Sequence, residues 1–171
     1  MFQPQPISRE SVPRALTRAE RYRLLNEPFQ AESICRDILA VDPGNQEATI
    51  GLLLALTDMF DTGEAKLNDV RAIARAITSA YEQLYYEGLA EERWACALVV
   101  QGYPAASVFD HFSFAMQRFE AAKKLAPAGN DDAVLRWNCC VRMLHRHGLA
   151  PEDESNPGDA CTLDDHDVPM R

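Results

Sequence analysis

The chain has 171 residues, of which 47% are hydrophobic and 25% are charged. These are the proportions of an ordinary globular protein that is long enough to bury a core. Its formal net charge of -9 argues against non-specific nucleic-acid binding, which requires a basic face. The charge is uneven, because residues 151–171 hold seven acids against Arg171 and so contribute -6. We therefore expect a nearly neutral folded body followed by an acidic tail.

No segment marks the chain for export or for a membrane. The N-terminus has no apolar stretch behind a basic start, so no secretory signal is predicted. The most apolar run, Ala48 to Leu56, is too short to cross a bilayer. The five cysteines are odd in number and lack the spacing of a disulfide framework. Together these features predict a cytoplasmic protein with reduced thiols.

The first part of the chain predicts three helices. Apolar residues recur at helical spacing over residues 12–25, and Asn26-Glu27-Pro28 should end this helix because proline starts a helix more readily than it continues one. A second helix is predicted over residues 29–41. Asn45 is a suitable N-cap for a third helix over residues 46–60. This third helix is apolar on nearly every side, which predicts a buried, central position.

The second part of the chain predicts longer helices. One should run from Leu67 to Tyr86, where Gly88 should break the pattern before another helix over residues 89–100. A long helix is then predicted over residues 105–125. Asn130 should cap a last helix from Asp131 to His147, with acids in its first turn and basic residues in its last, as the helix dipole favours.

One stretch of the chain occurs twice. Residues 115–127, AMQRFEAAKKLAP, match residues 31–43, AESICRDILAVDP, at their small, apolar and proline positions. The matched pairs are Ala31 with Ala115, Cys35 with Phe119, Ile38 with Ala122 and Pro43 with Pro127, and each pair is separated by 84 residues. This repetition predicts that the chain is built from a repeated helical unit.

The first copy and the helix before it, residues 15–43, resemble the tetratricopeptide repeat, a family with a 34-residue period. Ala19 stands at the small glycine position, Tyr22 at the tyrosine, Ala31 at the inter-helix alanine and Pro43 at the terminal proline. The departures are Ala15, Arg18 and Cys35, where the family has tryptophan, leucine and phenylalanine. The resemblance implies an all-α stack of helical hairpins, a right-handed superhelix of about seven helices with three irregular repeats and a terminal capping helix.

The implied repeats are not regular in length. Two repeats of 34 residues would place the copies 68 residues apart, so the observed 84 leaves about 16 extra residues. We assign them to the long helices over 67–86 and 105–125 and to their loops. The domain organisation predicted is a flexible lead-in over residues 1–11, a repeat domain over residues 12–148 and an acidic, disordered tail over residues 149–171.

Enzyme signatures are absent from the sequence. It has no glycine-rich phosphate loop, no Gly-x-Ser-x-Gly elbow and no His-Glu-x-x-His. Cys139, Cys140, His145 and His147 lie on one predicted helix, but their side chains point in different directions around it. A metal ion shared by these side chains is therefore disfavoured. A weak metal site from Cys161 and His166 in the tail is a remaining alternative. Glu91 and Glu92 are adjacent and do not face each other, which is more typical of solvated residues than of a catalytic acid and base pair. We therefore predict no catalytic activity, no metal and no cofactor.

In tetratricopeptide stacks the first helix of each repeat lines a concave groove that holds a peptide or a partner helix. The resemblance, applied by register, places six side chains on this groove: Glu20, Arg23, Glu92, Asp131, Asn138 and Arg142. Trp137, next to Asn138 in an Arg-Trp-Asn run, is added as a seventh candidate, although the family has a small residue at its position. Trp137 has two interpretations, because it is either an aromatic anchor for a partner or a residue that packs on Phe119.

The function expected is that of an interaction module, an adaptor or scaffold. Acids at the mapped positions disfavour an acidic ligand, so the partner expected is a basic or mixed-charge segment of another protein, rather than nucleic acid or a membrane. One alternative is a self-associating homodimer that pairs through an exposed face around Tyr81, Tyr85 and Tyr86. Another is a chaperone-like accessory subunit, or a subunit whose chemistry arises only with a partner.

Overall fold

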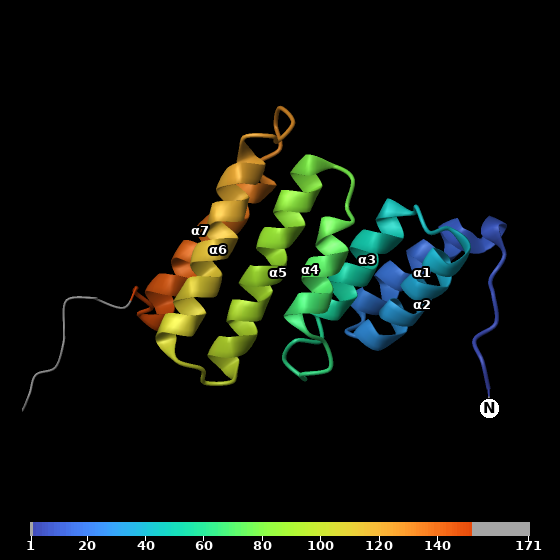
Figure 1. Ribbon diagram of the computed structural model, residues 1–171, viewed down its shortest axis with the longest axis horizontal. Coiled ribbons are helices and arrows are strands. Elements are labelled where there is room, and N and C mark those ends of the chain that lie inside the picture. The colour runs from blue at the N-terminus through green and yellow to red at the C-terminus, as the bar shows by residue number, and fades with distance from the viewer. Residues whose placement is uncertain (1, 152–171) are drawn as a thin grey trace, which may run out of the picture.

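The computed structural model describes residues 2–151, and every regular element in this range is a helix (Figure 1). A short 3-10 turn, η1 (Arg9–Ser11), precedes seven α-helices. Their bounds are α1 (Val12–Leu24), α2 (Pro28–Val41), α3 (Gln46–Thr57), α4 (Leu67–Arg75), α5 (Ala80–Val100), α6 (Ala105–Lys123) and α7 (Asp132–His147). The expected all-α fold is confirmed.

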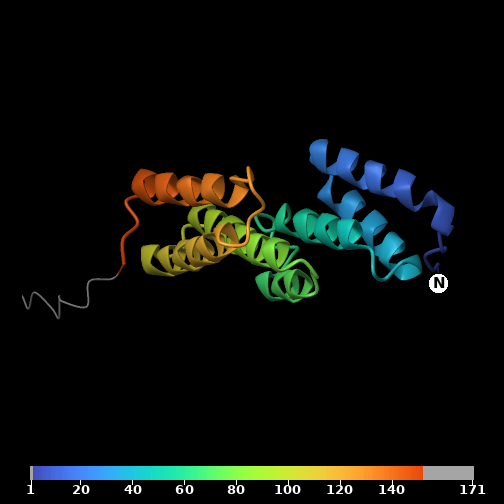
Figure 2. The same ribbon diagram turned by 90° about the horizontal axis from the view of Figure 1, so that it is seen from above.

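The helices are arranged in two layers. Each helix packs on its neighbours in the chain, and in addition α1 contacts α3, α3 contacts α5, and α5 contacts α7. The odd-numbered helices therefore form an inner layer, with the even-numbered helices outside it. Figure 2 shows α1 and α7 on one side of the molecule and α4 on the other. A chain of helical hairpins stacked on one another produces this alternation.

Local sequence signals account for most helix ends. Asn26, with a φ of 60°, ends α1, and Pro28 opens α2 at its first position. The Asn45 side chain accepts a hydrogen bond from the Ala48 amide at 2.9 Å, as predicted for the cap of α3. At the last helix, Asn130 accepts from the Asp132 amide at 2.9 Å, and α7 begins one residue later than predicted.

The division of residues 67–100 was predicted wrongly. The helix α4 ends at Arg75, and α5 runs unbroken from Ala80 through Gly88 to Val100. The break lies at residues 76–79, where Ser79 caps α5 by accepting from the Glu82 amide. Gly88 does not interrupt α5. A Cβ at this position would lie 2.8 Å from Cε1 of Phe119 and 3.1 Å from the Ala115 carbonyl oxygen, so glycine allows α6 to approach.

The duplicated stretch occupies equivalent, buried places. Ala31, Cys35 and Ile38 of α2 are at most 1% exposed, and so are Ala115, Phe119 and Ala122 of α6. The extra residues between the two copies lie only partly where predicted: the long helix expected over residues 105–125 is present as α6, but the other long helix is α5 and not one over residues 67–86. The helices α5 and α6 have 21 and 19 residues, against 13 and 14 in α1 and α2, whereas α4 has only nine. The lengthened unit is therefore the α5–α6 hairpin.

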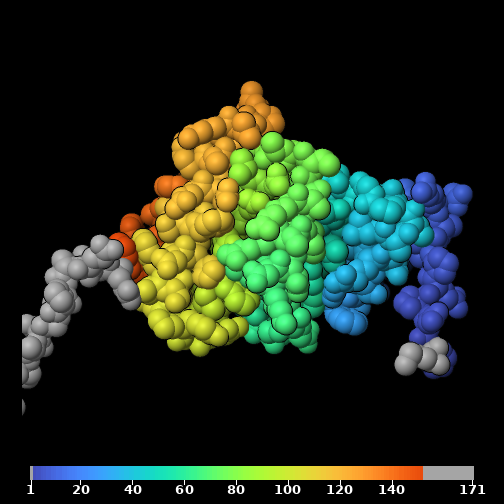
Figure 3. Space-filling view, in the orientation of Figure 1, coloured from blue at the N-terminus to red at the C-terminus, as the bar shows by residue number. Residues whose placement is uncertain are grey.

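A continuous hydrophobic core runs from α1 to α7, and a smaller cluster joins Val12, Ile38 and Ala48. Ile7 packs against this smaller cluster, so part of the predicted lead-in belongs to the fold. Figure 3 shows that the chain segments follow one another across a single continuous surface. None of the helices within residues 2–151 is long and apolar enough to cross a bilayer.

The folded body extends slightly beyond its predicted C-terminal boundary. Gly148 takes a left-handed conformation, with a φ of 60°, and ends α7. The Leu149 amide then donates to the Leu144 carbonyl at 3.0 Å, and the Leu149 side chain packs on the core. The remainder of the predicted tail, residues 152–171, lies outside the residues that the structure describes.

Candidate partner-binding groove

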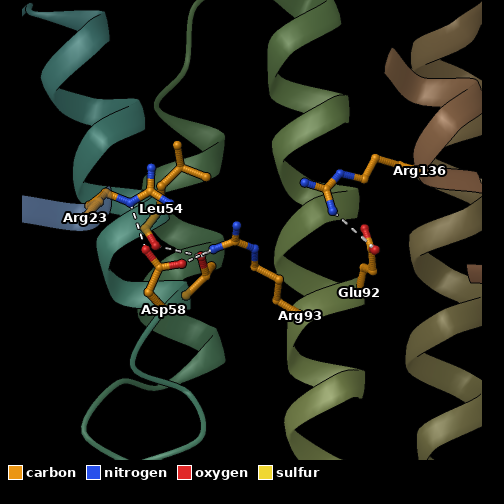
Figure 4. Close-up of polar contacts among 7 residues, drawn as sticks. Arg23, Leu54, Asp58, Glu92, Arg93 and Arg136 are labelled. Atoms are coloured by element: carbon orange, nitrogen blue, oxygen red, sulfur yellow. Dashed lines mark hydrogen bonds and ion pairs between the residues drawn. The ribbon is translucent and has the colours of Figure 1, made fainter. Parts of the chain in front are cut away.

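The inner layer carries a polar network centred on Asp58, directly after α3. One carboxylate oxygen of Asp58 accepts a hydrogen bond from Nε of Arg23 in α1 at 2.8 Å, and the other accepts from Nη1 of Arg93 in α5 (Figure 4). The same Arg93 nitrogen donates to Oγ1 of Thr57 at 2.8 Å, and Thr57 donates to the Leu54 carbonyl. The network therefore ties three successive inner helices together at one point.

Two cavities adjoin this network and share Arg23. One, of about 340 Å³, is lined by Arg23, Asn26, Thr57, Asp58, Asp61, Arg93 and Cys96. The other, of about 180 Å³, lies between α1 and α3 and has Leu16, Ile50 and Leu54 among its lining residues. Together they form a depression along the inner layer with a polar part and an apolar part. We call this depression the groove.

The charge of the groove is acidic overall. Its lining includes four carboxylates, Glu20, Glu47, Asp58 and Asp61, against the guanidinium groups of Arg23 and Arg93. Both arginines are already paired with Asp58. Glu20, Glu47 and Asp61 are exposed and form no ion pair within residues 2–151. The three exposed carboxylates are the groups that a positively charged ligand would meet.

Glu92 was expected to face a partner, and this expectation is wrong. Its side chain is only 4% exposed and lies between α5 and α7, where Oε1 is 3.4 Å from Nη1 of Arg136 (Figure 4). The other carboxylate oxygen, Oε2, is buried without a hydrogen-bond partner in the described residues. Burial raises the pKa of Glu92, and the neighbouring Arg136 opposes this rise only in part.

Glu91 is also buried, so the prediction of a solvated carboxylate pair is wrong for both residues. Its side chain is 1% exposed and faces α4 and α6, whereas Glu92 faces α7. Glu91 accepts from Nε of Arg71 in α4 at 2.6 Å and lies 2.7 Å from Nδ1 of His111 in α6. Burial alone would raise the pKa of Glu91, but the hydrogen bonds from His111 and Arg71 hold it below its usual value. This triad joins three helices.

The predicted α7 residues are divided between two sides of the helix. Trp137 and Asn138 turn toward α6, where they line a cavity of about 220 Å³ together with Phe119, Glu120 and Lys123. Trp137 is partly buried and packs against the core, as its packing interpretation predicted. Asp131 and Arg142 are exposed and take part in neither cavity of the groove. Of the seven predicted residues, Glu20 and Arg23 line the groove.

The predicted tyrosine face is not an open surface. Tyr81 donates a hydrogen bond to Oδ1 of Asn130 at 3.1 Å, which links α5 to the start of α7. Tyr85 packs on Tyr86 and on Phe119, with ring centroids 5.1 Å and 5.9 Å away. All three tyrosine rings are partly buried against the core. The homodimer alternative was based on exposed tyrosine rings, whereas these rings are partly buried within the chain.

The thiols within the described residues are poorly suited to nucleophilic chemistry. Burial raises the pKa of Cys35 and of Cys96 to about 11, and it also raises the pKa of Cys139 and of Cys140. Thiols with raised pKa values stay protonated at neutral pH, whereas the thiolate is the reactive form. Within residues 2–151 no three His, Cys, Asp or Glu side chains gather in a way that could hold a metal ion.

A larger cavity lies on the outer side of the molecule. Its volume is about 630 Å³, and Phe29, Leu56, Met59 and Ile73 contribute its apolar lining, with Glu32, Glu64 and Asp69 among the polar residues. It lies between α2 and α4 and is separate from the Asp58 network. It is a second surface, apart from the groove, at which a ligand could bind.

Comparison with protein-family models, with curated proteins and with solved structures finds no match.

Sequence reasoning missed the two residues that organise the groove, Asp58 and Arg93. Asp58 directly follows the apolar run of α3, and a lone acid at the end of such a run was a usable signal. Its pairing with Arg23 and Arg93 was not predictable, because it depends on how three helices are rotated against one another. The Ser79-x-x-Glu82 pattern was a second usable signal, since it is the sequence of a capping box.

Proposed function

We propose that this chain is an interaction module of tetratricopeptide type that holds a segment of another protein in the groove of its inner-layer helices. The observation that carries this proposal is the pair of adjoining cavities on α1, α3 and α5, one polar and one partly apolar, organised by Asp58. Their lining residues come from helices that are consecutive in the inner layer. Concave surfaces of stacked helical repeats commonly serve as extended binding surfaces.

The groove suggests how a ligand would bind. An apolar side chain of the ligand would enter the cavity beside Leu16, Ile50 and Leu54 and exclude water there. A lysine or arginine of the ligand would approach Glu20, Glu47 or Asp61. Because Asp58 already fixes Arg23 and Arg93, the polar wall would be pre-organised and would lose little conformational entropy on binding.

The partner class that fits this groove is a basic or mixed-charge peptide segment with at least one apolar residue. We propose an adaptor or scaffold role in the cytoplasm without catalysis. The raised pKa values of the thiols support the absence of a cysteine nucleophile.

The proposal can be tested by selecting ligands from a random-peptide display library with the full chain. We expect the selected peptides to combine basic and apolar residues. Replacement of Leu54 by arginine places a charge in the apolar cavity and should weaken binding of the selected peptides by at least about tenfold. The matched control is Gln117→Arg, which adds the same charge to an exposed position on α6 and should leave binding unchanged.

A second variant distinguishes a loss of binding from a loss of folding. Glu20→Lys with Glu47→Lys reverses two exposed charges at the groove and should lower the affinity for basic peptides without loss of helical circular dichroism. An acidic consensus among the selected peptides would overturn the charge assignment. Full binding by both folded groove variants would overturn the location of the site.

A further inference from the structure

One exposed face of α1 carries a stripe of arginines. Arg14, Arg18 and Arg21 are spaced by four and three residues, so they share one face of the helix with Leu25. All four side chains are exposed. Within residues 2–151 none of the three arginines forms an ion pair. Ala19 and Arg23 of the same helix instead line the cavity shared with α3. The arginine face is therefore distinct from the groove.

A cavity of about 310 Å³ lies on this face. It is lined by Arg18, Arg21, Tyr22 and Leu25. Two guanidinium groups offer planar donor pairs that match carboxylates, and the tyrosine and leucine provide an apolar surface beside them. The ligand chemistry that fits is a peptide segment with several carboxylates and some apolar residues.

The chain itself contains such a segment. Residues 151–171 hold seven acids against one arginine, whereas residues 1–25 hold five arginines against two glutamates. Asp164, Asp165 and Asp167 are followed by Val168 and Met170, so a group of carboxylates lies next to two apolar side chains in a short stretch. The charge of this segment is opposite to that of α1.

The segment is long enough to reach α1. The two helices α1 and α7 lie at opposite ends of the stack (Figures 1 and 2). The path from α7 to α1 along the inner layer crosses three helix-to-helix steps, on the order of 30 Å at about 10 Å each. Thirteen residues separate Pro151 from Asp164, and an extended chain of this length spans up to about 45 Å.

We propose that the acidic segment 152–171 folds back across the stack and binds the arginine face of α1 in the same chain. Asp164, Asp165 and Asp167 supply carboxylates to Arg18 and Arg21. The covalent tether raises the effective concentration of the segment to the order of millimolar, so weak individual ion pairs suffice. An external polyanion must displace this segment before it can bind α1.

The test uses nuclear magnetic resonance of the ¹⁵N-labelled full chain. Arginine Nε–Hε signals are compared between the wild type and a variant with Asp164, Asp165 and Asp167 replaced by asparagine. We expect the Arg18 and Arg21 signals to shift, and raising NaCl from about 0.05 to 0.5 M should move the wild-type signals toward those of the variant, because salt screens exposed ion pairs. These shifts should not depend on protein concentration.

The reciprocal arm observes the amide signals of residues 164–167. Replacement of Arg18 and Arg21 by glutamine should shift them, whereas the matched double variant Arg142→Gln, Arg146→Gln, which removes two exposed arginines of α7, should not. Unchanged α5 and α6 amide signals in each variant establish that the fold is intact. The proposal is overturned if the tail signals respond only to the α7 variant, if they respond to neither, or if the shifts grow with protein concentration, which would assign the contact to a second copy.

Discussion

Three acidic side chains have roles set by what surrounds them. Asp58 is partly exposed and pairs with two arginines of neighbouring helices, whereas Glu91 and Glu92 are buried and face different neighbours of α5. Glu91 receives hydrogen bonds on both of its oxygens, but Glu92 has one oxygen without a partner in residues 2–151. Burial of a carboxylate is unfavourable unless its oxygens are paired. The two neighbouring glutamates should therefore affect stability in opposite directions.

Replacement of Asp58 by asparagine should lower the free energy of unfolding by about 1–2 kcal/mol, because it weakens charge-assisted hydrogen bonds to Arg23 and Arg93 that are partly screened by solvent. Urea denaturation of the full chain measures this change. Asp61→Asn is the matched control, since Asp61 lines the same cavity but is exposed and unpaired within the described residues. The control should change stability by less than about 0.5 kcal/mol. Equal effects of the two variants would contradict a structural role for the Asp58 network.

Glu91→Gln should destabilise the protein by about 1–3 kcal/mol at pH 7, because Arg71 and His111 lose an ionised acceptor. The folded-state pKa of Glu91 is lowered, so its stabilising contribution is present above the unfolded pKa of about 4.3 and is lost as the pH falls through the folded value. The stability difference between wild type and Glu91→Gln should therefore shrink in acid. Urea denaturation at a series of pH values from about 2 to 8, which extends below the folded-state pKa of Glu91, measures it.

Glu92→Gln should show the opposite pH dependence in the same experiment. The folded-state pKa of Glu92 is raised, so the favourable protonated form is present below about pH 4.3 and is lost as the pH rises through the folded value. Removal of the charge should make the variant as stable as the wild type, or more stable, at pH 7. Parallel pH profiles for the two variants would show that the environments of Glu91 and Glu92 have been assigned wrongly.

The α5–α6 hairpin departs most from a regular repeat. Its helices are the two longest in the described residues, and they approach closely where Gly88 faces Phe119 and Ala115. Arg71 and His111 connect the same hairpin to α4 through Glu91. Close helix packing of this kind makes the hairpin sensitive to any added side-chain volume.

Gly88→Ala should destabilise the protein although alanine has a higher helix propensity than glycine. The gain from propensity is at most about 1 kcal/mol, whereas a Cβ placed 2.8 Å from the Phe119 ring should cost about 1–3 kcal/mol through overpacking. Thermal or urea denaturation measures the net loss. Phe119→Leu in the Gly88→Ala background should recover part of it, so the two substitutions should be non-additive. A more stable Gly88→Ala protein would contradict the close approach of α5 and α6.

Helix ends that depend on short-range signals were predictable. Pro28, Asn45 and Gly148 placed three of them within one or two residues, because a proline, a capping asparagine and a terminal glycine act through the local backbone. Gly88 was misinterpreted because glycine serves two purposes that the sequence alone does not distinguish. It can end a helix, or, as here, it can allow a neighbouring helix to pack closely. The groove was only partly predictable, since Asp58 and Arg93 meet through the tertiary arrangement of α3 and α5.

The whole molecule combines a long, tightly packed hairpin with shorter units. We expect amide hydrogen exchange of the full chain to be slowest in α5 and α6, whose facing surfaces are almost entirely buried, and faster in α4, which has nine residues and only three buried ones. Local opening in stacked repeats follows the stability of each unit and of its interfaces. Equal protection of α4, α5 and α6 would contradict this order.

The groove on the inner layer and the outer cavity between α2 and α4 are separate surfaces at which a peptide could bind. Chemical-shift mapping of a display-selected peptide on the ¹⁵N-labelled full chain distinguishes them. We expect the largest shifts at Glu20, Ile50 and Leu54, spreading to Cys96 on α5. Shifts confined to Phe29 and Ile73 would place the ligand in the outer cavity and contradict the proposal that the inner-layer helices hold the partner.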